Sequence, residues 1–276
     1  MRRIVHLSDL HFGRVREGLA DELLTTLKAL APDVIAISGD LTQRARHHQF
    51  EAARRFLDKL PAPHVTVPGN HDVPLENLLM RLWRPFSRYR KHISANLEPE
   101  HHDQKVSIVG VNTVNPYAWQ SGVFSKHAIR RVCDAFDMDD RMRIVVLHHP
   151  LTQQPGDTKQ PTKGAGRAVA ALSACGADIV LSGHLHSWRA RPFAAVEGGR
   201  EALLIQSGTT LSTRVRGEPN DFNLITLDGP DVTVKRFASG DTTAFSPAGE
   251  ARFTRVGHEW IEDDGNQAPE LRVAAS

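Results

Sequence analysis

The stretch LSGHLHSW, residues 181–188, ends an apolar run at a glycine and then places one histidine on each side of a leucine. Four other segments share this pattern of an apolar run that ends in Asp, Asn or His. They are LSDLH (7–11), ISGDL (37–41), VPGNHD (67–72) and VLHHP (146–150). Ligands of open α/β sheets bind beyond the carboxyl ends of the strands. We therefore expect these five strand ends to meet in space.

The bulk composition is that of an ordinary globular protein. The chain has 276 residues, 40% hydrophobic and 24% charged, and its formal net charge is +2. A net charge so close to zero does not predict binding to a nucleic acid polymer or to a membrane. The two cysteines, Cys133 and Cys175, lie among apolar residues in helix-like patterns. They are predicted to be buried thiols outside any disulfide framework.

The two ends of the chain carry no membrane signal. The first residues enter a strand pattern at once, without the apolar region and cleavage site of a signal peptide, and no apolar stretch of about 18 residues follows. We expect a cytoplasmic protein, and a homodimer is left open. The last residues lack periodicity. We therefore predict a single domain over residues 1–260 and a flexible tail over 261–276.

Strand patterns alternate with helix patterns over the first two thirds of the chain, which favours an α/β fold with a largely parallel sheet. After about residue 200, strand patterns follow one another with little between them. This change predicts a meander or a second sheet.

Seven side chains at the strand ends form a candidate metal-ligand set with two carboxylates, one amide and four imidazoles. They are Asp9, His11, Asp40, Asn70, His148, His184 and His186. Nitrogen and oxygen donors without thiolates suit Mn²⁺, with Fe or Zn²⁺ as alternatives. Seven ligands exceed the needs of one transition metal. They fit two divalent ions about 3.5–4 Å apart that share a carboxylate.

The five motifs DxH, GD, GNHD, HH and GHxH, in this order over roughly residues 3–225, resemble the calcineurin-like binuclear metallophosphoesterases. The segments GNHDVPL and SGTTLSTRVRGEPNDFN are most similar to the branch of class III cyclic-nucleotide phosphodiesterases. The resemblance implies a four-layer α-β-β-α sandwich, in which helices flank two packed β-sheets.

The resemblance also implies a role for each motif residue. The first metal would be held by Asp9, His11 and His186, the second by Asn70, His148 and His184, and Asp40 would bridge the two. Gly183 would let the chain turn tightly after its strand. A hydroxide held between the metals would attack phosphorus. His71 would stabilise charge or protonate the leaving oxygen, and Asp72 would orient it.

Three functions are compatible with these motifs. The first is a phosphodiesterase acting on a small diester such as a cyclic nucleotide. The second is a pyrophosphatase of a lipid-linked nucleotide sugar. The third is an inactive scaffold that binds a partner, although such a scaffold is expected to lose ligands and all seven are present here. Substrate choice lies in loops that the motifs do not describe.

Further residues have open roles. His149 is expected to pack beside His148 rather than to bind metal. Arg214 and Arg216 either contact a substrate phosphate or lie in a solvated loop. Residues 74–93 have apolar side chains at helical spacing, a proline at 85 and a local excess of arginine. This helix either faces the core, covers the site as a lid, or rests on anionic lipid, the only membrane contact that we consider.

Overall fold

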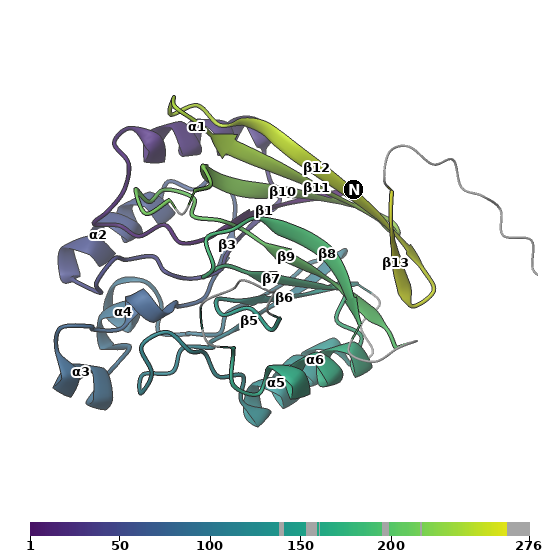
Figure 1. The fold of residues 1–276 in the computed structure, drawn as a ribbon, viewed down its shortest axis with the longest axis horizontal. Helices are drawn as coiled ribbons and strands as arrows, with labels where there is room; N and C mark the ends of the chain where they lie inside the picture. The colour runs from purple at the N-terminus through teal and green to yellow at the C-terminus, as the bar shows by residue number, and fades with distance from the viewer. Residues whose placement is uncertain (138–140, 153–158, 160, 195–198, 216, 264–276) are drawn as a thin grey trace, which may run out of the picture.

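A computed structural model describes residues 1–276 except 138–140, 153–158, 160, 195–198, 216 and 264–276. In the described residues, two β-sheets pack face to face and helices cover their outer faces (Figure 1). The predicted four-layer α-β-β-α sandwich is confirmed.

The first sheet combines a parallel part with an antiparallel meander. Its strands, in spatial order, are β13 (Glu259–Glu262), β12 (Ser246–Val256), β11 (Asp231–Ser239), β10 (Asn220–Asp228), β1 (Arg2–Leu7), β2 (Val34–Ile37) and β3 (His64–Thr66). Strands β1, β2 and β3 are parallel, and the others pair antiparallel. The closely spaced strand patterns after residue 200 therefore correspond, in part, to this meander.

The second sheet has a parallel centre and two antiparallel edges. Its strands, in spatial order, are β4 (Glu100–His102), β5 (Val106–Val111), β6 (Met142–Leu147), β7 (Ile179–Ser182), β9 (Glu201–Gln206) and β8 (Arg189–Ala194). The parallel strands of the chain are thus divided between two sheets. The expectation of one largely parallel sheet was wrong in this respect, because local periodicity does not reveal which strands pair.

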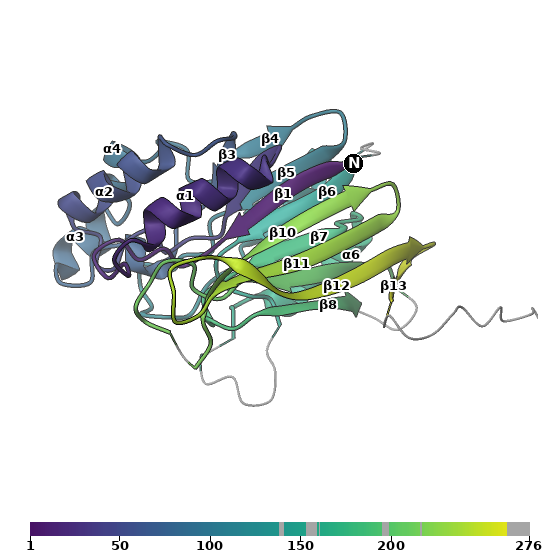
Figure 2. The same cartoon turned by 90° about the horizontal axis from the view of Figure 1, so that it is seen from above.

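Six α-helices lie in the described residues. They are α1 (Leu19–Leu30), α2 (His47–Leu57), α3 (Leu78–Trp83), α4 (Ser87–His92), α5 (Lys126–Phe136) and α6 (Ala165–Ala174), and a short 3₁₀ helix, η1, spans Asn70–Asp72. Helices α1, α2 and α4 lie over the β1–β3 half of the first sheet (Figure 2). Helices α5 and α6 cover the second sheet.

The alternation of side chains along each strand explains the layers. In β6, Ile144 and Val146 point into the core between the sheets, whereas Val145 and Leu147 point toward α5 and α6. In β1, Ile4 faces the core between the sheets and its neighbours face α1 and α2. Successive strand residues point to opposite faces. Continuous apolar runs are therefore the pattern expected for strands buried on both sides.

The cysteine prediction was wrong. Cys133 in α5 and Cys175 at the end of α6 are only partly buried, and they form a disulfide. Their Cα atoms lie 5.3 Å apart, within the usual span of such bonds. The pairing depends on how α5 packs against α6, which the sequence spacing does not show. Disulfides persist mainly in oxidising compartments, so the cysteines give the cytoplasmic prediction no support.

The predicted boundary at residue 260 falls inside a strand, because β13 includes Ile261 and Glu262. The remainder of the predicted tail, residues 264–276, lies outside the described residues. Among the described residues, none of the helices is both long and apolar enough to cross a membrane.

The segment 74–93 is not one core-facing helix. It forms α3 and α4, and Pro85 lies between them, as the pattern indicated. In α3, however, Leu78, Leu79, Leu82 and Trp83 are exposed to solvent. Helical spacing of apolar residues is the same whether their face meets a core or water. The core-facing interpretation was therefore wrong for α3, whereas α4 does face the core through Tyr89.

Candidate metal centre

The strand ends of both sheets meet at one end of the sandwich. Within each sheet, neighbouring parallel strands end side by side. Leu7 of β1 pairs with Ile37 of β2, and Val146 of β6 pairs with Leu181 of β7. Two contacts join the sheets there. The Nδ1–H of His148 donates to the Ser38 carbonyl at 2.7 Å, and the His184 backbone N–H donates to Asp9 Oδ2 at 2.9 Å. All seven predicted ligands lie in this region and are buried.

A first cluster contains Asp9, His11 and His186. Asp9 Oδ1 lies 2.9 Å from His186 Nε2 and 3.5 Å from His11 Nε2, and the two Nε2 atoms are 3.5 Å apart. The other oxygen, Asp9 Oδ2, accepts hydrogen bonds from the Ser8 hydroxyl and from His184 N. Asp9 Oδ1 is buried and lacks a well-oriented donor. The carboxylate is therefore held by one oxygen and presents the other to the cluster.

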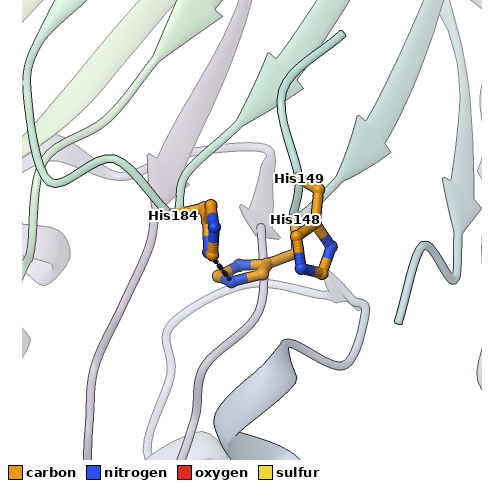
Figure 3. A group of neighbouring side chains, drawn as sticks. All are labelled: His148, His149 and His184. Atoms are coloured by element: carbon orange, nitrogen blue, oxygen red, sulfur yellow. Dashed lines mark hydrogen bonds between the residues drawn. The ribbon is translucent and has the colours of Figure 1, made fainter. Parts of the chain in front are cut away.

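A second cluster contains Asn70, His148 and His184. His148 Nε2 lies 3.1 Å from Asn70 Oδ1 and 3.1 Å from His184 Nδ1. Figure 3 shows the rings of His148 and His184 turned toward one another across the strand ends. Because Nδ1 of His148 carries a proton donated to Ser38, Nε2 of the neutral ring has a lone pair. That lone pair faces the amide oxygen of Asn70, which is also an acceptor, and a cation between the two atoms would satisfy both.

Asp40 lies between the two clusters. Its Oδ2 is 3.7 Å from His11 Nε2 and 3.5 Å from His148 Nε2, and its Oδ1 accepts a hydrogen bond from His71 N. Ligand atoms on one ion with bonds of about 2.0–2.2 Å are about 3–3.6 Å apart. The separations of 2.9–3.5 Å within the clusters match this spacing. The donor set therefore fits a divalent metal, and Asp40 lies within reach of both clusters.

Backbone carbonyls orient the imidazoles of the first cluster as well. His11 Nδ1 lies 3.4 Å from the Thr42 carbonyl, and His186 Nδ1 lies 3.2 Å from the Arg214 carbonyl. A carbonyl only accepts, so Nδ1 carries the proton and Nε2 keeps its lone pair. Fixing the tautomer in this way is typical of metal-binding histidines.

The protonation states of Asp9 and His184 are compatible with metal binding. Burial alone would raise the pKa of Asp9, but the neighbouring imidazoles of His186 and His11 outweigh it and hold the pKa well below its usual range. Burial, reinforced by His149, lowers the pKa of His184 far below that of a free histidine. Burial would lower the pKa of His11, but the carboxylates of Asp9 and Asp40 outweigh it and raise the pKa. Asp9 as a carboxylate and His184 as a neutral imidazole are in the states that bind metal.

The backbone at these positions is strained. Seven non-glycine residues in the described chain have positive φ, and five of them are predicted ligands: Asp9, His11, Asp40, His184 and His186, with φ between 49° and 71°. Such conformations cost about 1–3 kcal/mol each and gather at functional sites. The local conformational free energy is therefore raised at the positions that direct these side chains into the site.

Glycines allow the strand ends to approach. A Cβ on Gly183 would overlap Ser8 Oγ and lie 2.6 Å from Asp9 Oδ2, and a Cβ on Gly69 would overlap Asp40 Oδ1. Neither glycine has a positive φ. A tight turn does follow the strand, with Leu185 N donating to the Gly183 carbonyl, but its positive φ is at His184. Gly183 itself is required because Ser8 and Asp9 leave no room for a Cβ.

Residues 2–188 match the calcineurin-like phosphoesterases. The chain belongs to this family. Its members use divalent metals, in agreement with the ligand groups at the strand ends.

Relatives of this phosphoesterase include named phosphodiesterases. A probable cyclic nucleotide phosphodiesterase of Synechococcus sp. is 26% identical over 197 residues, which cover 66% of this chain and 72% of the relative. A glycerophosphodiester phosphodiesterase of Enterobacter lignolyticus is 33% identical over 81 residues, only 25% of this chain and 29% of the relative. The purple acid phosphatase PPD1 of yellow lupin shares the fold, with a TM-score of 0.62 at 14% identity over 92% of this chain and 54% of that one.

The surroundings of His71 differ from the prediction. In the phosphoesterase, His71 Nδ1 donates to the Gln43 carbonyl at 2.8 Å, and Asp72 does not contact the ring. The Asp72 carboxylate instead accepts hydrogen bonds from the backbone N–H groups of Leu41, Thr42 and Gly69. Asp72 therefore fixes the loop that follows Asp40, and its predicted role in orienting His71 was wrong.

His149 packs beside His148, as predicted (Figure 3). Its ring centroid is 4.8 Å from that of His148 and 4.6 Å from that of His184. Its Nδ1 pairs with the Thr113 hydroxyl at 2.9 Å, whereas its buried Nε2 has no hydrogen-bond partner among the described residues. His149 thus belongs to a group of three imidazoles that could hold a metal. The doublet HH was the only sequence signal for it.

One of the two arginines left open reaches the site. Arg214 Nη1 lies 3.3 Å from His71 Nε2, and its carbonyl orients His186. Arg216 lies outside the described residues. Arg214 was found from the sequence only as one of two alternatives, because loop position alone does not distinguish a solvated arginine from one beside the site.

Proposed function

We propose that this phosphoesterase is a phosphodiesterase that uses two divalent metal ions, most simply Mn²⁺, and hydrolyses a small diester such as a cyclic nucleotide. The observation that carries the proposal is the pair of buried ligand clusters with Asp40 Oδ2 between them. The names of two relatives support a diester substrate.

The ligand roles follow from the distances. Asp9, His11 and His186 would hold one ion, Asn70, His148 and His184 the other, and Asp40 both. When bound, such ions act as Lewis acids toward phosphoryl oxygens and lower the pKa of water.

His71 and Arg214 are the residues placed to contact the water or the substrate. Because His71 donates its Nδ1–H to Gln43, its Nε2 is an acceptor, and Arg214 is placed to donate to it. Burial lowers the pKa of His71 to about 4, so the ring is neutral at pH 7. His71 is therefore arranged to accept a hydrogen bond from water or from an attacking hydroxyl. The Arg214 guanidinium is arranged to pair with a phosphoryl oxygen.

A substrate comparison tests the proposal. We expect Mn²⁺-loaded protein to hydrolyse bis(p-nitrophenyl) phosphate at least about tenfold faster, in kcat/KM, than p-nitrophenyl phosphate, and EDTA to abolish both reactions. Cyclic nucleotides, glycerophosphodiesters and a nucleotide-sugar lipid complete the panel. A preference for the monoester would refute the diester assignment, and a preference for the lipid would assign the pyrophosphatase activity instead.

Replacing His71 separates its two predicted roles. We expect His71→Ala to retain two metals per chain and to lower kcat by about 10²-fold, with the same factor for good and poor leaving groups. The reason is that Nε2 has no proton to deliver. The measurement is kcat over a series of aryl phosphodiesters, with metal content by mass spectrometry. A loss that grows with the pKa of the leaving group would restore the role of proton donor.

A further inference from the structure

The exposed large hydrophobic side chains of the protein are concentrated in one place. Of ten such residues in the described chain, six lie in α3 and in the loop 115–119. We call this surface the apolar patch: Leu78, Leu79, Leu82, Trp83, Tyr117 and Trp119. Trp83 is 85% exposed and Leu79 is 75% exposed. Single exposed apolar residues are normal, whereas a cluster of this kind marks an interaction surface.

The patch is held in place by a buried arginine. Arg81 of α3 is 3% exposed and donates to the carbonyls of Pro116 and Ala118 at 2.7 and 2.6 Å. Its guanidinium lies 5.3 Å from the centre of the Trp119 ring. These hydrogen bonds join α3 to the loop 115–119 through a buried side chain. The exposed side chains therefore sit on a fixed base rather than on a frayed turn.

The segment that contains α3 and α4 is basic, and the exposed Glu76 just before it pairs with Arg44 and Arg46. Between Asn77 and Leu97 the chain contains four arginines and one lysine and no Asp or Glu. Arg84, Arg90 and Lys91 are exposed. Arg84 also lines, with Leu79, Met80 and Trp83, an open groove of about 390 Å³. An occupant of this surface must offer apolar groups together with negative charge.

We propose that the apolar patch seats on an anionic lipid bilayer. Leu78, Leu79 and Leu82 would enter the acyl boundary, the rings of Trp83, Tyr117 and Trp119 would lie at the headgroup level, and Arg84 would meet lipid phosphates. A second copy of the chain is a poorer occupant. A two-fold interface brings each patch against itself, so that Arg84, which lines the groove of the patch, would approach its own copy. Glu76, the acidic residue that precedes the patch, already pairs with Arg44 and Arg46.

The apolar patch lies near the metal centre. The patch begins at Leu78, six residues after Asp72 and the end of η1, which carries Asn70 and His71. Figure 1 shows α3 at one end of the molecule and β13 at the other. A bound bilayer would therefore lie on the side of the metal centre. The proposal concerns binding alone and stands whether or not a diester is the substrate.

Vesicle binding tests the proposal with the full chain. The probe is co-sedimentation with phosphatidylcholine vesicles that contain either no anionic lipid or one third phosphatidylglycerol. We expect wild-type protein to bind the anionic vesicles at least about tenfold more strongly, and high salt to weaken this binding. Leu79→Ser with Trp83→Ser should reduce it at least about tenfold, and Arg84→Gln with Lys91→Gln to a similar extent.

A matched control carries the same kind of change on another surface. Val256→Ser with Ile261→Ser replaces two side chains that are 54% and 53% exposed on β12 and β13, and it should bind vesicles as the wild type does. Melting temperature and metal content verify the fold of each variant. The proposal is overturned if wild-type protein ignores anionic vesicles or if the control loses as much binding as the patch variant. It is also overturned if sedimentation velocity shows a dimer that only the patch variant dissociates, since a second copy would then cover the patch.

Discussion

Asp40→Asn leaves fewer than two metal ions per chain and lowers turnover by at least about 10³-fold. This expected result follows from the position of Oδ2 between His11 Nε2 and His148 Nε2, at 3.7 and 3.5 Å. An asparagine retains an oxygen that can accept the hydrogen bond from His71 N, which Asp40 Oδ1 now accepts at 2.8 Å. What it loses is the negative charge and the second oxygen. The substitution therefore removes the bridge while keeping the loop contact.

Metal content by mass spectrometry and turnover of bis(p-nitrophenyl) phosphate measure the two effects. Asp58→Ala changes a surface carboxylate that pairs with Arg54 of α2. It is the matched control and should change neither quantity. Asp40→Ala should be at least as severe, because it also removes the acceptor for His71 N. Two retained metals with near-normal turnover in Asp40→Asn would show that Asp40 is not the bridge.

Gly183→Ala is expected to lower metal content and to reduce turnover by at least about 10²-fold, although it adds only one methyl group. The new Cβ would overlap Ser8 Oγ and come within 2.6 Å of Asp9 Oδ2. Those two atoms share the hydrogen bond that holds the Asp9 carboxylate. The strand end cannot move away freely, because the neighbouring His184 N–H is bonded to the same oxygen. The methyl group therefore displaces Asp9 from the first cluster.

The control for this variant is Gly166→Ala in α6, where a Cβ would meet no atom within 4 Å. It should leave turnover unchanged and raise stability by about 0.5–1 kcal/mol, since alanine is the better helix former. Thermal melts of both variants distinguish a local displacement from unfolding. If Gly183→Ala keeps full activity and metal content, the strand ends are not packed against Asp9 as described.

The sequence by itself determined the chemistry of each strand end. A strand and the two or three residues after it form a local unit, so the apolar runs and their terminal Asp, Asn and His side chains could be read directly. The rule that parallel strands present their carboxyl ends on one side was enough to predict that Asp9 and Asp40 meet. His148 follows a strand of the other sheet, so its place beside them depends on how the two sheets pack. The five motifs in order indicated the family that the comparison then showed.

Only the tertiary structure decided what depends on contacts between distant segments. Asp72 faces the backbone of residues 41–42 rather than its neighbour His71, and Cys133 meets Cys175 because α5 packs beside α6. Gly183 is needed because Asp9, far away in the sequence, would lie only 2.6 Å from a Cβ at this position. The apolar stripe of α3 had the same period whether it faced protein or water. Periodicity specifies that an element has an apolar face, whereas the packing of all the other elements decides what that face meets.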